Sequence, residues 1–74
     1  EILRSEQYSL GWMYGNGRGV PQDYVMAHMF FNVAAAGGKK VAEENRDIAA
    51  KLMTPSQIEK AQDLAREWMQ NHQE

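Results

Sequence analysis

The sequence predicts an all-α protein of four helices, and two observations carry that prediction. Glycine and proline interrupt the 74-residue chain at three places, which divides it into four segments: Gly15–Pro21, Gly37–Gly38 and Thr54–Pro55. Each segment has apolar residues at spacings of three and four, and none alternates strictly as a strand would. The helices are expected near residues 3–14, 23–36, 39–52 and 55–71.

The first expected helix carries apolar side chains on two faces. Leu3, Leu10 and Tyr14 share one face, whereas Tyr8 and Trp12, one turn apart, lie on roughly the opposite face. An exposed aromatic pair is typical of a recognition surface, because each ring buries a large area and loses few rotamers. The pair would equally suit packing on a preceding helix pair. Both interpretations stay open, with Trp12 closer to the first and Tyr8 to the second.

The second expected helix follows a glycine-rich loop and has Asp23 as its N-cap. The loop, residues 15–19, comes after a helix and has the spacing of neither common phosphate-binding motif, so it predicts a turn. The helix is apolar nearly all round, which is typical of a helix buried on more than one side. The helix then lies either between other helices of this chain or against a chain outside it, and for the second stripe we favour an N-terminal neighbour outside this chain. The first stripe is Tyr24, Ala27, Phe30, Phe31, Ala34 and Ala35, the second is Val25, Met29 and Val33, and His28 and Asn32 form a polar seam.

The third and fourth expected helices are one-sided, apolar toward the protein and polar toward water. Asn45 lies on the apolar side of the third helix, where a buried amide must be hydrogen-bonded. It either clamps the backbone of the preceding turn, which is favoured, or contacts a ligand. In the fourth helix, Thr54, Pro55 and Gln57 predict a capping box. The apolar residues are Val41, Ala42, Ile48, Ala49 and Leu52 in the third helix and Ile58, Ala61, Leu64, Ala65, Trp68 and Met69 in the fourth.

Composition argues against several function classes. The balance of 8 basic and 10 acidic residues, with a net charge of −2, does not suit nucleic acid or an anionic bilayer. The longest uncharged stretch, residues 24–38, is shorter than the roughly 20 apolar residues of a membrane span. There is no cysteine, and two histidines are too few for a metal site. No serine or threonine has a base at suitable spacing. We therefore expect no enzyme, cofactor or metal, and the compartment stays open.

A weak internal period of about 34 to 36 residues relates the two halves of the chain. Four apolar positions of the second helix, Ala27, Phe30, Phe31 and Ala34, align with Ala61, Leu64, Ala65 and Trp68 of the fourth. A period in this range, with one helix pair per unit, is typical of an α/α solenoid, in which stacked pairs bury faces that neither pair can bury alone.

One run of the sequence has glycine, aromatic and alanine residues in a fixed pattern: Leu10-Gly11-x-Met13-Tyr14-x-x-Gly17-x-Gly19-Val20-x-x-Asp23-Tyr24-x-x-Ala27-x-x-Phe30-x-x-x-Ala34-Ala35-x-x-Gly38. This run resembles a complete Sel-one-like repeat, the tetratricopeptide-related solenoid unit, and the match covers residues 6–38. It departs from the usual family pattern at Glu6, where a small residue is usual, and at Phe30, where Trp is common. Residues 39–74 resemble the C-terminal ending of such proteins, with Ala42-x-x-Asn45-Arg46-Asp47 opening a degenerate unit and Met53-Thr54-Pro55-x-Gln57-Ile58 leading into a last amphipathic helix.

The resemblance implies a right-handed α/α superhelix, a solenoid of antiparallel helix pairs, with one full repeat in residues 1–38 and a degenerate repeat with a capping helix in residues 39–74. It also implies an adaptor or scaffold, of a kind common in bacteria, that binds a protein or peptide along a groove lined by the first helix of each unit. The partner-binding residues expected there are Arg4, Tyr8, Trp12 and Asn45. The alternative is a structural C-terminal cap or self-association segment of a longer repeat protein, with no separate ligand.

Overall fold

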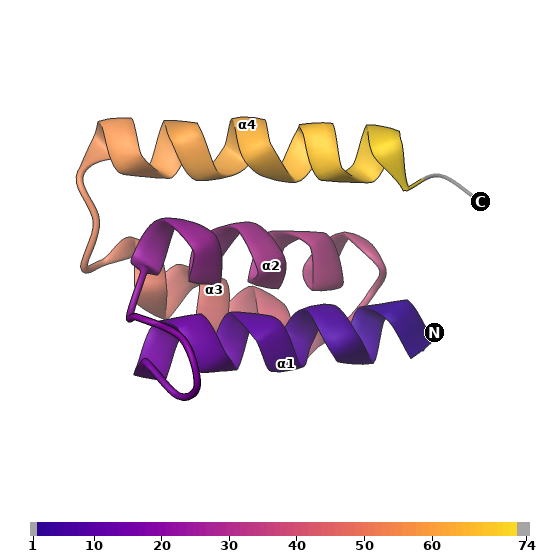
Figure 1. Cartoon of the computed structure of the whole chain (residues 1–74). Coiled ribbons are helices and arrows are strands. Elements are labelled where there is room, and N and C mark those ends of the chain that lie inside the picture. The colour runs from indigo at the N-terminus through magenta and orange to yellow at the C-terminus, as the bar shows by residue number, and fades with distance from the viewer. Residues whose placement is uncertain (1, 73–74) are drawn as a thin grey trace.

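The computed structural model describes the backbone of residues 2–72 and the side chains of residues 6–72. Over residues 2–72 the fold consists of four helices, as predicted, and it is all-α. Consecutive helices run antiparallel, with α2 in the middle, α1 and α3 on one side of it and α4 on the other (Figure 1). The helices are α1 (Ile2–Asn16), α2 (Tyr24–Ala36), α3 (Lys40–Ala50) and α4 (Pro55–Asn71).

Local interactions at the helix starts follow the sequence prediction. The carboxylate of Asp23 accepts a hydrogen bond from the backbone N–H of Met26 at 3.2 Å, which caps α2. At the start of α4, the Thr54 hydroxyl accepts from the Gln57 N–H at 3.2 Å, and the Gln57 side chain accepts from the Thr54 N–H at 2.9 Å. The predicted capping box is therefore confirmed. The glycine-rich loop is a turn, as predicted, in which Gly17 and Gly19 have φ angles of 67° and 80°.

The core is organised around α2, which buries seven of its 13 residues, whereas α3 and α4 each bury two alanines. Toward α1 and α3, the ring of Phe31 packs in a cluster of small residues and partly buried tyrosines. Gly11 of α1 makes this approach possible, because a Cβ there would lie 2.7 Å from Phe31 Cδ1. The cluster contains Ala27, Phe31, Ala34 and Ala42, with Tyr8, Tyr14 and Ala35 against it.

The second stripe of α2 is covered within the chain, which corrects the expectation of a neighbour outside it. Met29 and Val33 are only 5% and 7% exposed because α4 lies over them. The partly buried Trp68 belongs to the same cluster, and Tyr14 stacks on Phe30 with ring centroids 5.9 Å apart. The helices of this chain therefore cover α2 on two opposite sides, and Phe30 of the first stripe shares a cluster with Met29 and Val33 of the second.

The charged residues Glu43, Glu44 and Asp47 of α3 face solvent, as expected, but the expectation that all its apolar residues face the protein is wrong. Only Ala42 and Ala49 of its apolar residues are buried. Val41, Ile48 and Leu52 are 40%, 58% and 59% exposed, respectively. The small alanine side chains let α3 pack closely on α2, and the larger apolar side chains beside them are left at the surface.

Tyr8 faces the interior of this chain, which corrects its expected position opposite the core. Its ring lies 5.7 Å from the ring of Phe31, at an interplanar angle of 50°. Its hydroxyl lies 3.4 Å from the side-chain nitrogen of Asn45 on α3, and the ammonium of Lys39 lies 5.2 Å from its ring centre. Tyr8 thus joins α1 to α2 and α3. Helical periodicity grouped it with Trp12 but could not show that Tyr8 is partly buried while Trp12 stays 46% exposed.

Candidate functional site

A cavity of about 310 Å³ opens where α1, α2 and α3 meet. Its floor is made of residues that are almost fully buried: Ala27 and Phe31 from α2 and Ala49 from α3. Its rim is made of large apolar side chains that reach solvent: Trp12 from α1, and Ile48 and Leu52 from α3 and the residues after it. Such a concave apolar site with a few polar groups is the usual form of a binding site.

The cavity exists because small residues lie between large ones. Gly15 of α1 has no side chain to fill the space, and Ala27 and Ala49 fill little of it. Trp12, one turn before Gly15, does not fill this space either, and it is 46% exposed. A ring of that size left at the surface is typical of interface residues.

Three polar side chains complete the lining, and the cavity carries no formal charge at neutral pH. They are Asn16, Tyr24 and Asn45. The side-chain nitrogen of Asn45 donates to the backbone oxygen of Val41 at 2.8 Å, so the predicted clamp on the preceding turn is confirmed. In the same way, Asn16 donates to the backbone oxygen of Trp12 at 2.9 Å. These bonds fix the orientation of both amides, because a backbone carbonyl can only accept.

The structure brings Trp12 and Asn45 together at one cavity, with Tyr8 beside it through its contact with Asn45. Arg4 lies in α1, but its side chain is outside the described residues. Ile48 and Leu52 were not among the expected binding residues, because both fit the apolar stripe of their helix. The sequence did contain one indication, the small residue Ala49 between them. An alanine packed against another helix brings the two helices close together, so that the larger side chains beside it are left at the surface.

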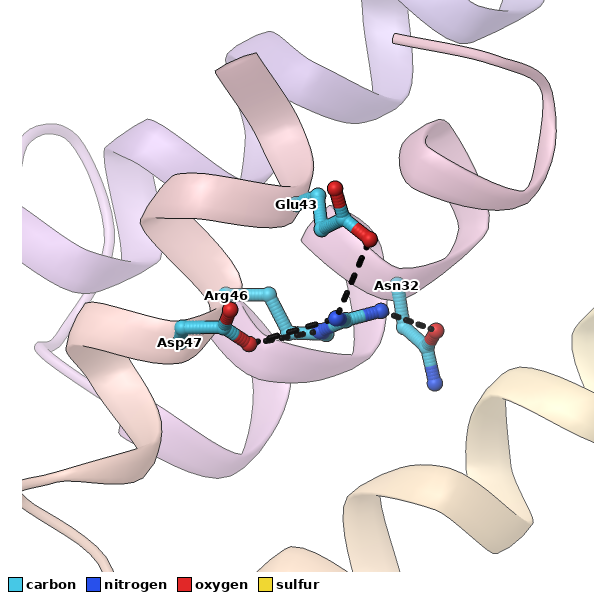
Figure 2. A network of polar contacts seen from close by, with 4 residues as sticks. All are labelled: Asn32, Glu43, Arg46 and Asp47. Atoms are coloured by element: carbon cyan, nitrogen blue, oxygen red, sulfur yellow. Dashed lines mark hydrogen bonds and ion pairs between the residues drawn. The ribbon is translucent and has the colours of Figure 1, made fainter. Parts of the chain in front are cut away.

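A separate polar network holds the other side of α3 against α2 (Figure 2). Arg46 contacts the Asp47 carboxylate through its Nε and Nη2 atoms, each at 3.2 Å, and Glu43 lies 3.9 Å from Nη2. The Nη1 atom of Arg46 lies 3.5 Å from the side-chain oxygen of Asn32, in the expected polar seam of α2. Exposed ion pairs of this kind contribute little energy. The network therefore adds one polar contact between α3 and α2, from Arg46 to Asn32, and lies outside the cavity.

His28, the other member of the seam, is 3% exposed, and its Nδ1 atom has no hydrogen-bond partner among the described residues. Burial lowers the pKa of His28 below its ordinary value of 6.5, and the positive charge of Arg46 lowers it further, against a smaller opposing effect of Asp47. The side chain is therefore a neutral member of the core at pH 7.

A shallower cavity of about 220 Å³ lies between α2 and α4. Its lining includes Met26 and Met29 on one side and Trp68 and His72 on the other. The imidazole of His72 stacks on Trp68 with ring centroids 3.9 Å apart, and its Nδ1 atom lies 2.8 Å from the Trp68 backbone oxygen. Within residues 2–72, no group of three His, Asp or Glu side chains is placed to hold a metal ion. Over the same residues, no helix has the length and hydrophobicity to span a membrane.

Comparison with known families gives one assignment. The Sel1 repeat model matches residues 7–39, which contain α2 and most of α1, and residues 52–71, which contain α4. No curated protein and no solved structure matches the chain. The two matched segments together cover more than half of the chain, and they include Trp12, Asn16, Tyr24 and Leu52 of the cavity. The protein therefore belongs to the Sel1 repeat family.

Proposed function

We propose that this protein binds a segment of another protein on the surface between α1 and α3, as an adaptor or scaffold. Sel1 repeats generally mediate protein–protein interaction. The observation that carries the proposal is the exposure of Trp12, Ile48 and Leu52 around one cavity, at 46%, 58% and 59%. We call these three residues, together with Asn45, the α1–α3 face.

The composition of this face supports a protein partner. Aromatic side chains are enriched at protein interfaces, and the residues that dominate binding energy are commonly Trp or Tyr in well-packed pockets. Trp12 meets this description, because it stands next to a cavity that an incoming side chain could fill. Asn45 and Tyr8 are already hydrogen-bonded to each other, so they offer a partner a preordered surface that loses little entropy on binding.

The division of the chain belongs to the same proposal. We take residues 1–38 as one full repeat and residues 39–74 as the degenerate repeat with its capping helix. The α1–α3 face then joins the first helices of two successive units. Support for this division comes from α4, which covers Met29 and Val33 with one side and exposes charged residues such as Glu59 and Lys60 on another.

Selection from a peptide display library, with the 74-residue chain as bait, tests the proposal. Peptides enriched by the wild-type chain are expected to bind Trp12→Ala at least about thirtyfold more weakly, the scale of a dominant interface residue. Gln62→Ala, an exposed change on α4, is the matched control and should bind normally. Far-UV circular dichroism would show that all variants keep their helices. Peptides that bind Trp12→Ala as well as wild type would refute the assigned face.

Self-association is the competing function, because a second copy could cover the same apolar residues. Sedimentation velocity over a wide concentration range separates the two. We expect a monomer throughout. A dimer that Ile48→Glu dissociates would instead identify the α1–α3 face as a contact between copies of this chain.

A further inference from the structure

The polar groups of the cavity point to the form of the partner, if the proposed function holds. Asn16 and Asn45 each direct the side-chain nitrogen to the backbone of their own helix. In the described part of the chain, neither side-chain oxygen accepts a hydrogen bond. An amide oxygen has two lone pairs, so each of these residues offers an unused acceptor beside the apolar cavity.

The lining also indicates what can enter. No lining residue is charged at neutral pH, and the floor is almost fully buried. A Lys, Arg, Asp or Glu side chain inserted there would lose its hydration without gaining an opposite charge, which is costly. A volume of about 310 Å³ is at the small end of the range for ligand pockets, so it suits one large side chain better than a row of them.

We propose that the cavity takes one bulky uncharged side chain from an extended segment of the partner, whose flanking backbone N–H groups donate to the side-chain oxygens of Asn16 and Asn45. The extended form follows from the acceptors. Beyond its first turn, a helix uses its backbone N–H groups internally, so a helical partner has few to donate. An extended segment leaves them free for hydrogen bonds with the protein it binds.

The test uses a display-selected peptide whose binding depends on Trp12, and it changes the peptide so that the fold of the protein is not at issue. Replacing the bulky residue with Glu or Lys should weaken binding at least about thirtyfold. N-methylation removes one backbone donor at a time. At one or two amides next to the bulky residue it should weaken binding about tenfold, and elsewhere it should have little effect.

The results separate this inference from the function on which it rests. Trp12-dependent peptides that carry a charged residue at the critical position would overturn the inference alone. So would peptides that tolerate every N-methyl group and become helical on binding, as measured by circular dichroism. Failure to select any peptide, or selection only of peptides that ignore Trp12, would overturn the proposed function and this inference with it.

Discussion

Gly11 and Gly15 of α1 both face α2, but only Gly11 lies too close to it for a side chain. Substitutions at the two positions therefore distinguish the effect of packing on stability from the effect of helix propensity. A Cβ at Gly11 would lie 2.7 and 2.8 Å from two ring carbons of Phe31, whereas a Cβ at Gly15 would lie 3.7 Å from the Ala27 Cβ. The first distance is a steric clash and the second is ordinary contact. Both positions are helical, so alanine gains roughly 0.5 to 1 kcal/mol of intrinsic helix stability at each.

Gly11→Ala is therefore expected to destabilise the protein by about 1 to 3 kcal/mol, because the Phe31 ring must shift in a packed core. Gly15→Ala is the matched variant and should stabilise it by up to about 1 kcal/mol. Urea unfolding followed by circular dichroism measures both. Equal changes in stability would show that α1 and α2 do not approach at Gly11 as described.

His28 should make stability depend on pH near neutrality. Its pKa is lowered in the folded state, chiefly by burial and then by Arg46, so the unfolded chain takes up the proton first as pH falls below about 6.5. The free energy of unfolding should be fully present above that pH and should decrease as pH falls from 7 toward 5. His28→Leu should flatten this part of the profile.

Gln62→Leu is the control for this measurement, because it makes a similar replacement at an exposed position of α4 and removes no titratable group. It should leave the pH dependence as in the wild-type chain. Denaturant midpoints at pH 7 and pH 5 are enough for the comparison. An identical decrease in His28→Leu and wild type would assign the effect to other groups.

At the scale of elements, the capping box at the start of α4 contributes to the stability of the helix that covers α2. Thr54→Ala removes the hydroxyl that accepts the Gln57 N–H and should cost about 0.5 to 2 kcal/mol. Gln62→Ala, at an exposed position further along α4, is the control and should change stability by less than about 0.5 kcal/mol. Thermal unfolding of the two variants tests the prediction, and equal melting temperatures would contradict it.

The limits and starts of the helices were predictable because local chemistry determines them. Asp23 and Thr54 cap helices through groups only three residues away, and Gly17 and Gly19 form a turn by their own backbone freedom. The clamp made by Asn45 was predictable for the same reason, since its acceptor is one turn back.

The choice of neighbour for each face was not predictable from one sequence. Helical periodicity shows that Met29 and Val33 share a stripe, but either α4 or another chain could cover it. Tyr8 and Trp12 also share a spacing, yet Tyr8 is partly buried against Phe31 and Asn45, whereas Trp12 is 46% exposed at the cavity. The cavity beside Trp12 forms because Gly15 of α1 and Ala49 of α3 line the same space, and only the tertiary packing of the helices brings them together.

At the scale of the whole molecule, every helix depends on α2. The main contacts of α1, α3 and α4 are all with that helix. The fluorescence of the two tryptophans can follow the two sides of α2 separately. Trp12 lies at the cavity beside α3, and Trp68 packs on Met29 and Val33. Because no helix pair has a core without α2, the chain should unfold in one cooperative step.

The single-tryptophan variants Trp68→Phe and Trp12→Phe test that cooperativity from the two sides. Within each variant, the urea midpoint from tryptophan fluorescence should coincide with the midpoint from circular dichroism, even though the two variants differ in stability. A fluorescence midpoint for Trp68 well below the midpoint for the helices would show that α4 detaches first. Coincidence in both variants would show that the four helices unfold together. The α1–α3 face would then exist only while α4 is in place, because the clusters on the two sides of α2 form and break as one unit.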